Sequence, residues 1–173
     1  GGAPLRPRLI KGIDGDNVCT APEIIHGVRT FKDSVVAVVG SGMTGLETTE
    51  ILNENGNHVV VVEMADTVAP GTWFQLVDDE MERIGQYETE FLTGKRLVKI
   101  LPDRIIVEDT KTSMLSEILV DGVVLSLGVR PVNELAKKLD GKYKYVVTVG
   151  DAKKSGRIAD AVHDAFNAVM RIK

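Results

Sequence analysis

Two valine-rich runs dominate the hydrophobic pattern of the chain. Val35–Val39 and Val59–Val62 contain only apolar residues, and uninterrupted runs of this kind predict strands buried on both faces of a parallel sheet. Between them, Leu46–Asn55 has the apolar spacing of a helix. Gly56 is suited to end this helix, because glycine tolerates the left-handed conformation. The pattern therefore predicts a strand–turn–helix–strand unit.

Short strand-like runs follow in the middle of the chain. Trp73–Ile84 still has helical spacing, but Arg96–Leu101, Arg104–Glu108 and Ser116–Val120 are typical of short strands. They predict a β-meander inserted into the α/β unit. Val123–Leu127 then predicts another buried strand.

The two ends of the chain differ from this middle part. Residues 1–30 are rich in Pro and Gly, which predicts a loop-rich connector. Near the other end, the pattern predicts a helix at Asn133–Leu139, a strand at Tyr145–Val149 and an amphipathic helix at about Gly156–Ile172. Together the elements predict an α/β fold, a Rossmann-like three-layer nucleotide-binding domain with an inserted β-meander.

Composition narrows the classes of partner. The chain has 173 residues, with 21 Lys and Arg against 25 Asp and Glu, which gives a formal net charge of −4. This mildly acidic balance argues against a nucleic-acid partner and against an anionic membrane surface. The apolar runs are far shorter than the roughly 18 residues of a membrane helix, and no signal peptide is recognised. We therefore expect a cytoplasmic protein.

Metal and disulfide chemistry are not expected. Cys19 is the only cysteine and the three histidines lie far apart in the sequence, so the chain has no disulfide pair and no metal-ligand spacing. The chain has no initiator Met and opens on Gly1-Gly2-Ala3-Pro4. This opening favours a fragment of a longer protein.

The strongest chemical signal is a glycine-rich turn between the first predicted strand and its helix. In the GxGxxG pattern, Gly40 makes the tight turn, Gly42 lets the backbone approach a pyrophosphate, and Gly45 lets the helix pack on the sheet. The helix N-terminus favours an anion. Glu63 ends the second strand, where it can accept hydrogen bonds from the adenosine ribose. The alternative is a purely structural turn with a solvated Glu63.

The same carboxylate bears on the choice of coenzyme. A carboxylate repels the 2′-phosphate of NADP(H), and NADP(H) sites usually place an Arg nearby. Met64–Gln75 contains no Lys or Arg. The sequence therefore favours NAD(H).

Two further segments end predicted strands with glycine. Ser126–Pro131 allows the chain to turn beneath a ligand, although a plain turn with a surface Arg130 explains it equally well. Thr148–Asp151 ends in Gly-Asp. Without further information, Asp151 is best explained as a residue that caps a turn.

With these motifs in this order along the sequence, the chain resembles the pyridine nucleotide-disulfide oxidoreductase superfamily, whose members are flavoproteins with two dinucleotide-binding domains. In that family an NAD domain is inserted within an FAD domain. The resemblance covers essentially the whole chain and rests on four matching segments: the crossing at Gly1–Pro7, the NAD motif at Gly40–Glu47, the exit motif at Gly128–Pro131, and the second FAD signature at Thr148–Asp151.

The resemblance assigns cofactor roles to individual residues and implies no catalytic residue and no metal ligand in this chain. Glu47 would lie near the nicotinamide, and Asp151 would hold the ribityl–pyrophosphate region of FAD. The full NAD(H) set is Gly40, Gly42, Met43, Thr44, Gly45, Glu47, Glu63 and Gly128. The FAD set, for a complete FAD domain, is Gly1, Gly2, Gly150 and Asp151.

The C-terminal part most resembles one branch of the superfamily, the old-yellow-enzyme-like NADH:flavin oxidoreductases such as 2-enoate reductase and 2,4-dienoyl-CoA reductase. That branch implies an upstream barrel with FMN and a [4Fe–4S] cluster. The expected domains are an FAD-domain remnant and connector at 1–30, an NAD(H)-binding domain at 31–132 and a C-terminal FAD-domain remnant at 133–173. The first FAD-binding glycine motif, the barrel and the cluster cysteines are absent from this sequence.

The expected function is an NADH-binding module that delivers hydride to flavin for reduction of an enoate or enoyl-CoA, inactive as an isolated fragment. Its expected partners are NADH, the missing FAD half-domain and the barrel of the same polypeptide. A self-contained NAD dehydrogenase is an alternative, but the usual Tyr-x-x-x-Lys pair is missing. A binding-only sensor or interaction module is the other alternative.

Overall fold

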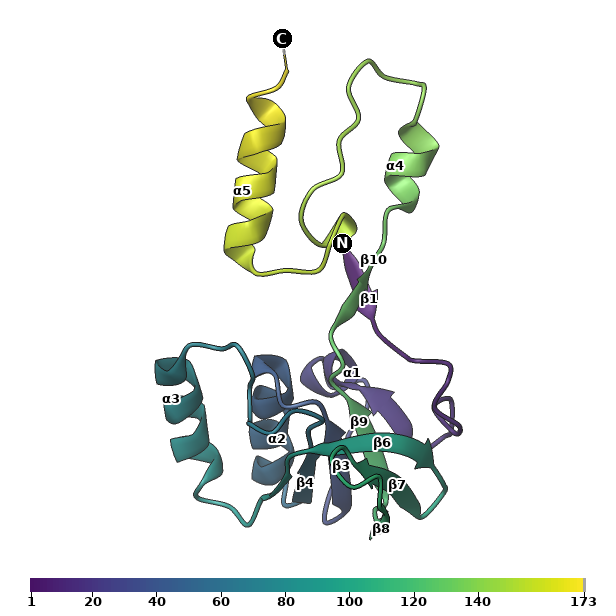
Figure 1. Ribbon diagram of the computed structural model, residues 1–173, viewed down its shortest axis with the longest axis vertical. Coiled ribbons are helices and arrows are strands. Elements are labelled where there is room, and N and C mark those ends of the chain that lie inside the picture. The colour runs from purple at the N-terminus through teal and green to yellow at the C-terminus, as the bar shows by residue number, and fades with distance from the viewer. Residues whose placement is uncertain (173) are drawn as a thin grey trace. The chain divides into compact units, whose positions relative to one another are not determined.

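The computed structural model describes residues 1–172, and the chain divides into two compact units. The larger unit is Arg6–Leu127, and the smaller unit combines Gly1–Leu5 with the segment that starts at Gly128. Figure 1 shows both units, which are described separately below.

A five-stranded parallel sheet forms the centre of the larger unit. Its strand order is β2-β9-β3-β4-β5, and every neighbouring pair is parallel. The strands are β2 (Val18–Thr20), β3 (Val35–Val39), β4 (His58–Val62), β5 (Glu90–Leu92) and β9 (Gly122–Leu125). The prediction of a parallel α/β sheet is confirmed.

The valine runs are buried on both faces because their side chains alternate between two hydrophobic clusters. Val36 and Val38 belong to the cluster on the side of α1 and α2, whereas Ala37 and Val39 belong to the cluster on the side of the meander. All four are less than 5% exposed. This explains why the sequence shows a continuous apolar run rather than an alternating one.

Helices and a meander form the outer layers of the larger unit. The helices are α1 (Ala21–Ile25), α2 (Met43–Glu54) and α3 (Phe74–Ile84), and Figure 1 shows α2 and α3 side by side. The predicted β-meander is confirmed as an antiparallel sheet in the order β6-β7-β8. Its strands are β6 (Lys95–Ile100), β7 (Arg104–Asp109) and β8 (Leu115–Leu119).

The smaller unit has few regular elements. An antiparallel ribbon pairs β1 (Gly2–Pro4) with β10 (Val129–Pro131). Further elements are α4 (Glu134–Leu139), the short 3₁₀ helix η1 (Gly150–Ala152) and α5 (Ile158–Val169).

One prediction about the ends of the chain is wrong. Residues 145–149 form no strand, because within residues 1–172 no other strand pairs with them. The predicted amphipathic helix is confirmed as α5, and its apolar side chains are exposed, with Ile158 at 86% and Phe166 at 64%. Residues 1–30 are mostly irregular, as predicted, but they also contain α1 and β2, an edge strand of the main sheet.

Candidate functional site

The glycine-rich turn joins β3 to α2, and two of its glycines are required by the protein itself. Gly40 has a φ of +101°, and a Cβ on it would lie 2.4 Å from the carbonyl oxygen of Ser126. A Cβ on Gly45 would lie 2.0 Å from the carbonyl oxygen of Gly40. These contacts confirm the predicted roles of the two glycines in the tight turn and in close helix packing.

Gly42 differs from both. Its φ of −60° suits any residue, and a Cβ on it would meet no atom within 4 Å. It is the N-cap of α2, so it lies where the first N–H groups of the helix are available to an anion. Nothing in the fold therefore requires glycine at this position.

An open pocket of about 430 Å³ adjoins this turn at the carboxyl ends of β3, β4 and β9. Parallel α/β sheets bind ligands at this edge. Met64, Pro70 and Leu97 give the pocket apolar walls, and Gly42 and Glu63 are also among its lining residues. The remaining lining residues are Pro7, Ile10, Val39, Gly40, Val62, Lys95, Arg96, Ser126 and Leu127.

The Glu63 carboxylate is held by the turn that it faces. Its Oε2 accepts hydrogen bonds from the backbone N–H of Ser41 at 2.9 Å and from the Ser41 hydroxyl at 2.7 Å. Its Oε1 accepts one from the N–H of Ala65 at 2.8 Å. Burial raises the pKa of Glu63, but these donors outweigh burial, and its pKa lies below the ordinary value. Glu63 is therefore an ionised acceptor in the pocket.

Two basic residues at the pocket were missed from the sequence. Lys95 and Arg96 come from β6, about thirty residues after Glu63. Backbone hydrogen bonds place this strand beside the end of β4, since the N–H of Lys95 donates to the carbonyl oxygen of Glu63 at 2.8 Å. The absence of Lys and Arg from Met64–Gln75 therefore does not by itself decide the coenzyme.

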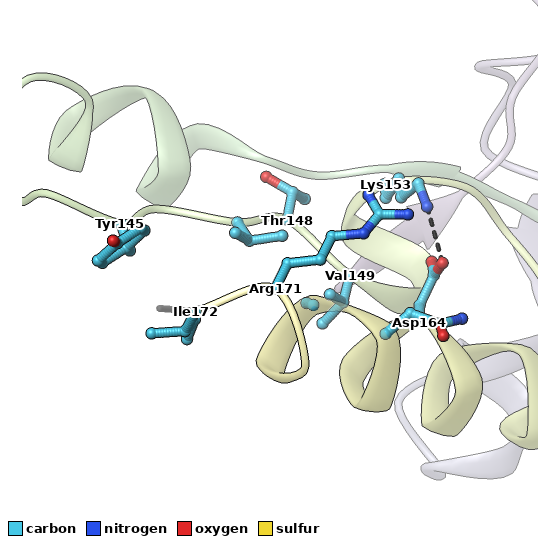
Figure 2. Close-up of a pocket in the computed structure, with 10 residues that line it drawn as sticks. Tyr145, Thr148, Val149, Lys153, Asp164, Arg171 and Ile172 are labelled. Atoms are coloured by element: carbon cyan, nitrogen blue, oxygen red, sulfur yellow. Dashed lines mark hydrogen bonds and ion pairs between the residues drawn. The ribbon is translucent and has the colours of Figure 1, made fainter.

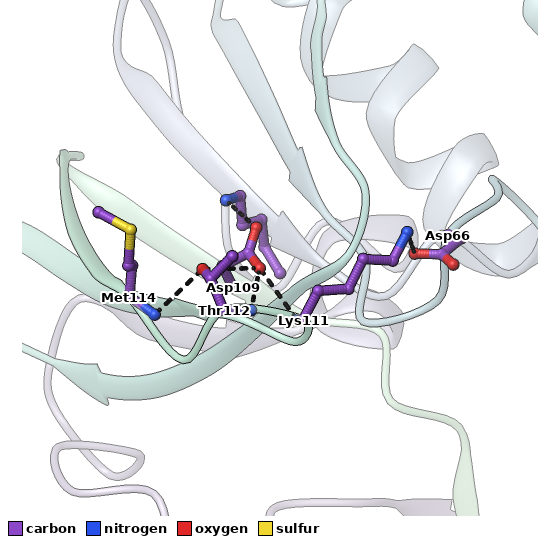
Figure 3. A network of polar contacts seen from close by, with 6 residues as sticks. Asp66, Asp109, Lys111, Thr112 and Met114 are labelled. Atoms are coloured by element: carbon purple, nitrogen blue, oxygen red, sulfur yellow. Dashed lines mark hydrogen bonds and ion pairs between the residues drawn. The ribbon is translucent and has the colours of Figure 1, made fainter.

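Both basic residues are paired with acids on β7. Lys95 Nζ lies 2.8 Å from Asp109, and an Arg96 guanidinium nitrogen lies 2.9 Å from Glu108. Figure 3 shows that Asp109 also accepts hydrogen bonds from the following turn, including the N–H and hydroxyl of Thr112. The bond from Lys95 is the main reason that the pKa of Asp109 is lowered. The pocket thus contains two cations that are each paired with a carboxylate.

The other residues predicted to bind NAD(H) are divided between the two units. Met43, Thr44 and Glu47 lie in the first turns of α2, with Met43 half-buried and the other two exposed. Gly128 lies in the smaller unit, where it has a φ of +81° and accepts a hydrogen bond from the N–H of Leu5 at 2.9 Å. The binding roles of all four remain predictions.

The four residues predicted to bind FAD all lie in the smaller unit. Gly1 and Gly2 lie at the start of the chain, where a Cβ on Gly2 would come within 3.5 Å of Asp151 Oδ2. Gly150 has a φ of +57° and begins η1. Asp151 Oδ1 accepts a hydrogen bond from the N–H of Gly156 at 3.1 Å, as a turn-capping residue does. The fold thus brings Gly2 and Asp151 together from opposite ends of the sequence.

A second pocket in the smaller unit, of about 220 Å³, lies between residues 145–149 and α5. Figure 2 shows Lys153 and Asp164 joined by an ion pair on its rim, at 2.7 Å, and Arg171 reaching across it. Tyr145 and Ile172 lie at its far side.

Metal ligands are not gathered within residues 1–172, where no group of three His, Cys, Asp or Glu side chains could hold an ion. Cys19 is buried, and burial raises the pKa of its thiol to about 11. It is therefore an inert core residue at neutral pH. None of the helices in this part of the chain has both the length and the apolar character needed to cross a bilayer.

Comparisons with known proteins agree with this geometry. Residues 1–151 match the family model described as pyridine nucleotide-disulphide oxidoreductase. An NADH oxidase of Thermoanaerobacter brockii is 36% identical over 180 residues, which cover 99% of this chain and 27% of that protein. An NADH oxidase of Methanocaldococcus jannaschii is 34% identical, covering 87% of this chain and 35% of that protein.

Solved structures show the same fold. A 2-naphthoyl-CoA reductase complex matches all of this chain with a TM-score of 0.86 and 24% identity, over 26% of its own length. The 6-hydroxypseudooxynicotine amine oxidase of Pseudomonas geniculata N1 matches 94% of this chain with a TM-score of 0.82 and 26% identity, over 25% of its own length. The chain thus spans about a quarter of these proteins and of the first of the two NADH oxidases.

Proposed function

The chain belongs to the pyridine nucleotide-disulphide oxidoreductase family, a family of NAD(P)H-dependent flavin oxidoreductases, and from this premise we propose that it is the NADH-binding module of a larger flavoenzyme. NADH supplies a hydride and FAD is the proposed acceptor, for the reduction of an organic substrate such as an enoate or enoyl-CoA. The residues of this chain bind and orient the dinucleotide. The similarity to an NADH oxidase supports this proposal, and the 2-naphthoyl-CoA reductase shares the fold.

Gly42 carries the proposal. Gly40 and Gly45 are required by contacts within the protein, whereas Gly42 has an unstrained backbone and open space where a Cβ would lie. Its lack of a side chain is explained if a ligand approaches the backbone there. A pyrophosphate is the group that suits this place, because it would meet free N–H groups at the start of α2.

The charges in the pocket favour NADH over NADPH. Glu63 is ionised and faces the pocket, where it would accept a hydrogen bond from a ribose hydroxyl and repel a 2′-phosphate. Lys95 and Arg96 could attract a 2′-phosphate, but each is paired with a carboxylate. Binding of Lys95 or Arg96 to a phosphate would break its ion pair.

The flavin sites differ in how well they fit this chain. Gly2 and Asp151 lie close together, as a shared FAD site requires, so these residues would hold the FAD if the complete domain is assembled. A [4Fe–4S] cluster needs four thiolate ligands, and the chain has one cysteine, which is buried. We therefore place the cluster, and with it FMN, in another part of the larger protein.

A self-contained dehydrogenase is less well supported. It would need a proton donor beside the nicotinamide, and the Tyr-x-x-x-Lys pair that usually supplies one is missing from the sequence.

The test compares Gly42→Ala with the wild-type chain by titration with NADH. Because the added methyl group would occupy the space proposed for the pyrophosphate, we expect NADH to bind at least about tenfold more weakly, which corresponds to about 1.4 kcal/mol. The free energy of unfolding should change by less than about 0.5 kcal/mol, as for an ordinary surface substitution.

Glu54→Ala, at the far end of α2, provides a matched control and should bind NADH like the wild type. Unchanged binding by Gly42→Ala would contradict the proposal, as would an absence of saturable NADH binding by the wild-type chain.

A further inference from the structure

Ser41 connects three segments around the adenosine side of the proposed site. Its side chain is fully buried, at 0% exposure. Its hydroxyl donates to Glu63 Oε2 at 2.7 Å and accepts a hydrogen bond from the N–H of Ala69 at 3.0 Å. One hydroxyl thus joins the glycine-rich turn, the end of β4 and the loop that precedes α3.

These contacts fix how Glu63 faces the pocket. Ser41 supplies both donors to Oε2, from its N–H and its hydroxyl, whereas Oε1 has the N–H of Ala65. The N–H of Met64 also helps to lower the pKa of Glu63. Ser41 therefore holds Oε2 against the glycine-rich turn, while Glu63 remains among the residues that line the pocket.

The third contact holds a strained residue. Ala69 has a φ of +46°, a conformation that costs a non-glycine residue free energy, and it is 3% exposed. Its N–H is bonded to the Ser41 hydroxyl. The next residue, Pro70, lines the pocket together with Met64, so the shape of this wall depends on the same hydroxyl.

We propose that Ser41 is a positioning residue that makes the site select the free adenosine ribose diol of NADH over the 2′-phosphorylated ribose of NADPH. This inference rests on the proposed function. A carboxylate held through Ser41 stays directed at the pocket, where it repels a 2′-phosphate and accepts a hydrogen bond from a ribose hydroxyl. Without the Ser41 hydroxyl, Oε2 keeps only the N–H of Ser41 and is held less firmly, and the loop at Ala69 loses an anchor.

The test is a double-mutant cycle on coenzyme selectivity, which is the dissociation constant of NADPH divided by that of NADH. We expect Ser41→Ala to lower this ratio by about tenfold, because it removes a hydrogen bond to a charged group. Glu63→Gln should also lower it. In the Glu63→Gln background, Ser41→Ala should have almost no further effect on the ratio, because Ser41 acts through Glu63.

Thr49→Val is the matched control. Thr49 is also fully buried, and its hydroxyl donates to the carbonyl oxygen of Gly45 at 2.9 Å. This variant should lose stability to a similar degree as Ser41→Ala and keep the wild-type ratio. Ser41→Cys retains the side-chain shape with a weaker donor and should lower the ratio by less than Ser41→Ala.

The outcomes separate this inference from the proposed function. If Glu63→Gln lowers the ratio and the two Ser41 variants leave it unchanged, Ser41 is only structural and the inference is overturned while the proposed function stands. If the wild-type chain binds neither nucleotide, both fail. If Ser41→Ala lowers the ratio by the same factor in the wild type and in the Glu63→Gln background, Ser41 does not act through Glu63 and the inference is overturned.

Discussion

The three glycines of the turn between β3 and α2 differ in what requires them. The fold requires Gly40 because of its backbone angle and Gly45 because of the neighbouring carbonyl oxygen, whereas no contact in the fold requires Gly42. The sequence spacing predicted these positions, because each follows from the path of the chain from a strand into a helix. The motif also assigned Gly40 and Gly45 to the path of the chain and Gly42 to a ligand, and the structure adds the contacts behind the first two assignments.

Gly45→Ala should therefore act mainly on stability. Its Cβ would lie 2.0 Å from the Gly40 carbonyl oxygen, which is backbone and cannot rotate away. We expect a loss of about 1–3 kcal/mol in the free energy of unfolding, as for other overpacked interiors. Urea denaturation of Gly45→Ala beside Gly42→Ala measures this. Equal stability of the two variants would contradict the distinction.

Glu63 gives the fold a specific dependence on pH. Its pKa is lowered below the ordinary value of 4.5 on folding, so the ionised carboxylate stabilises the folded state above that pH. This contribution is lost as the pH falls through the lower folded pKa. We expect the stability difference between wild type and Glu63→Gln to shrink as the pH falls below 4.5 and through the lower folded pKa. Denaturant titrations at each pH provide the measurement, and a constant difference would be inconsistent with this role.

At the scale of elements, the meander brings charge to the pocket from a distant part of the sequence. Lys95 and Arg96 lie beside Glu63 because β6 runs along the end of β4, a contact that no local pattern encodes. The prediction of NAD(H) considered only the segment directly after Glu63 and so missed them. Their pairing with Asp109 and Glu108 is consistent with the proposed preference for NADH.

Releasing one of these pairs should weaken that preference. In Glu108→Gln, Arg96 loses its partner and becomes available to a 2′-phosphate. We expect NADPH to bind about threefold more tightly, since an exposed ion pair is worth at most about 1 kcal/mol. NADH binding should change little.

Glu117→Gln is the control for this variant, because it removes a carboxylate from Arg104, which does not line the pocket. An equal gain in NADPH affinity for both variants would point to overall charge instead of Arg96.

Elements were predictable where their residues carry a local pattern. The valine runs of β3 and β4 and the helical spacing of α3 are patterns of this kind. β2 has only three residues and exists because it pairs with β9, more than a hundred residues later. Residues 145–149 show the opposite case, because they have strand-like composition but no partner strand within the described chain.

At the scale of the whole molecule, the hydrophobic core lies in one of the two units. Every buried hydrophobic residue found in residues 1–172 falls between Ile13 and Leu125, within the larger unit. The apolar side chains of α5 in the smaller unit are exposed. The larger unit therefore has what a separately folding domain needs.

We expect residues 6–127, expressed alone, to unfold cooperatively. Their free energy of unfolding should be lower by no more than about 1 kcal/mol than that of the main unfolding transition of the whole chain. Denaturation followed by circular dichroism tests this, with the 173-residue chain measured in parallel. A fragment without a cooperative transition would show that the core needs the smaller unit.

The ribbon of β1 and β10 has a consequence for the history and the engineering of this fold. The chain enters the larger unit after Leu5 and leaves it at Gly128, and these two residues are hydrogen-bonded to each other at 2.9 Å. Paired antiparallel strands are about 5 Å apart, so the larger unit joins the rest of the chain at two neighbouring points, as a hairpin loop does. A unit attached in this way can be inserted into another protein in place of a hairpin loop.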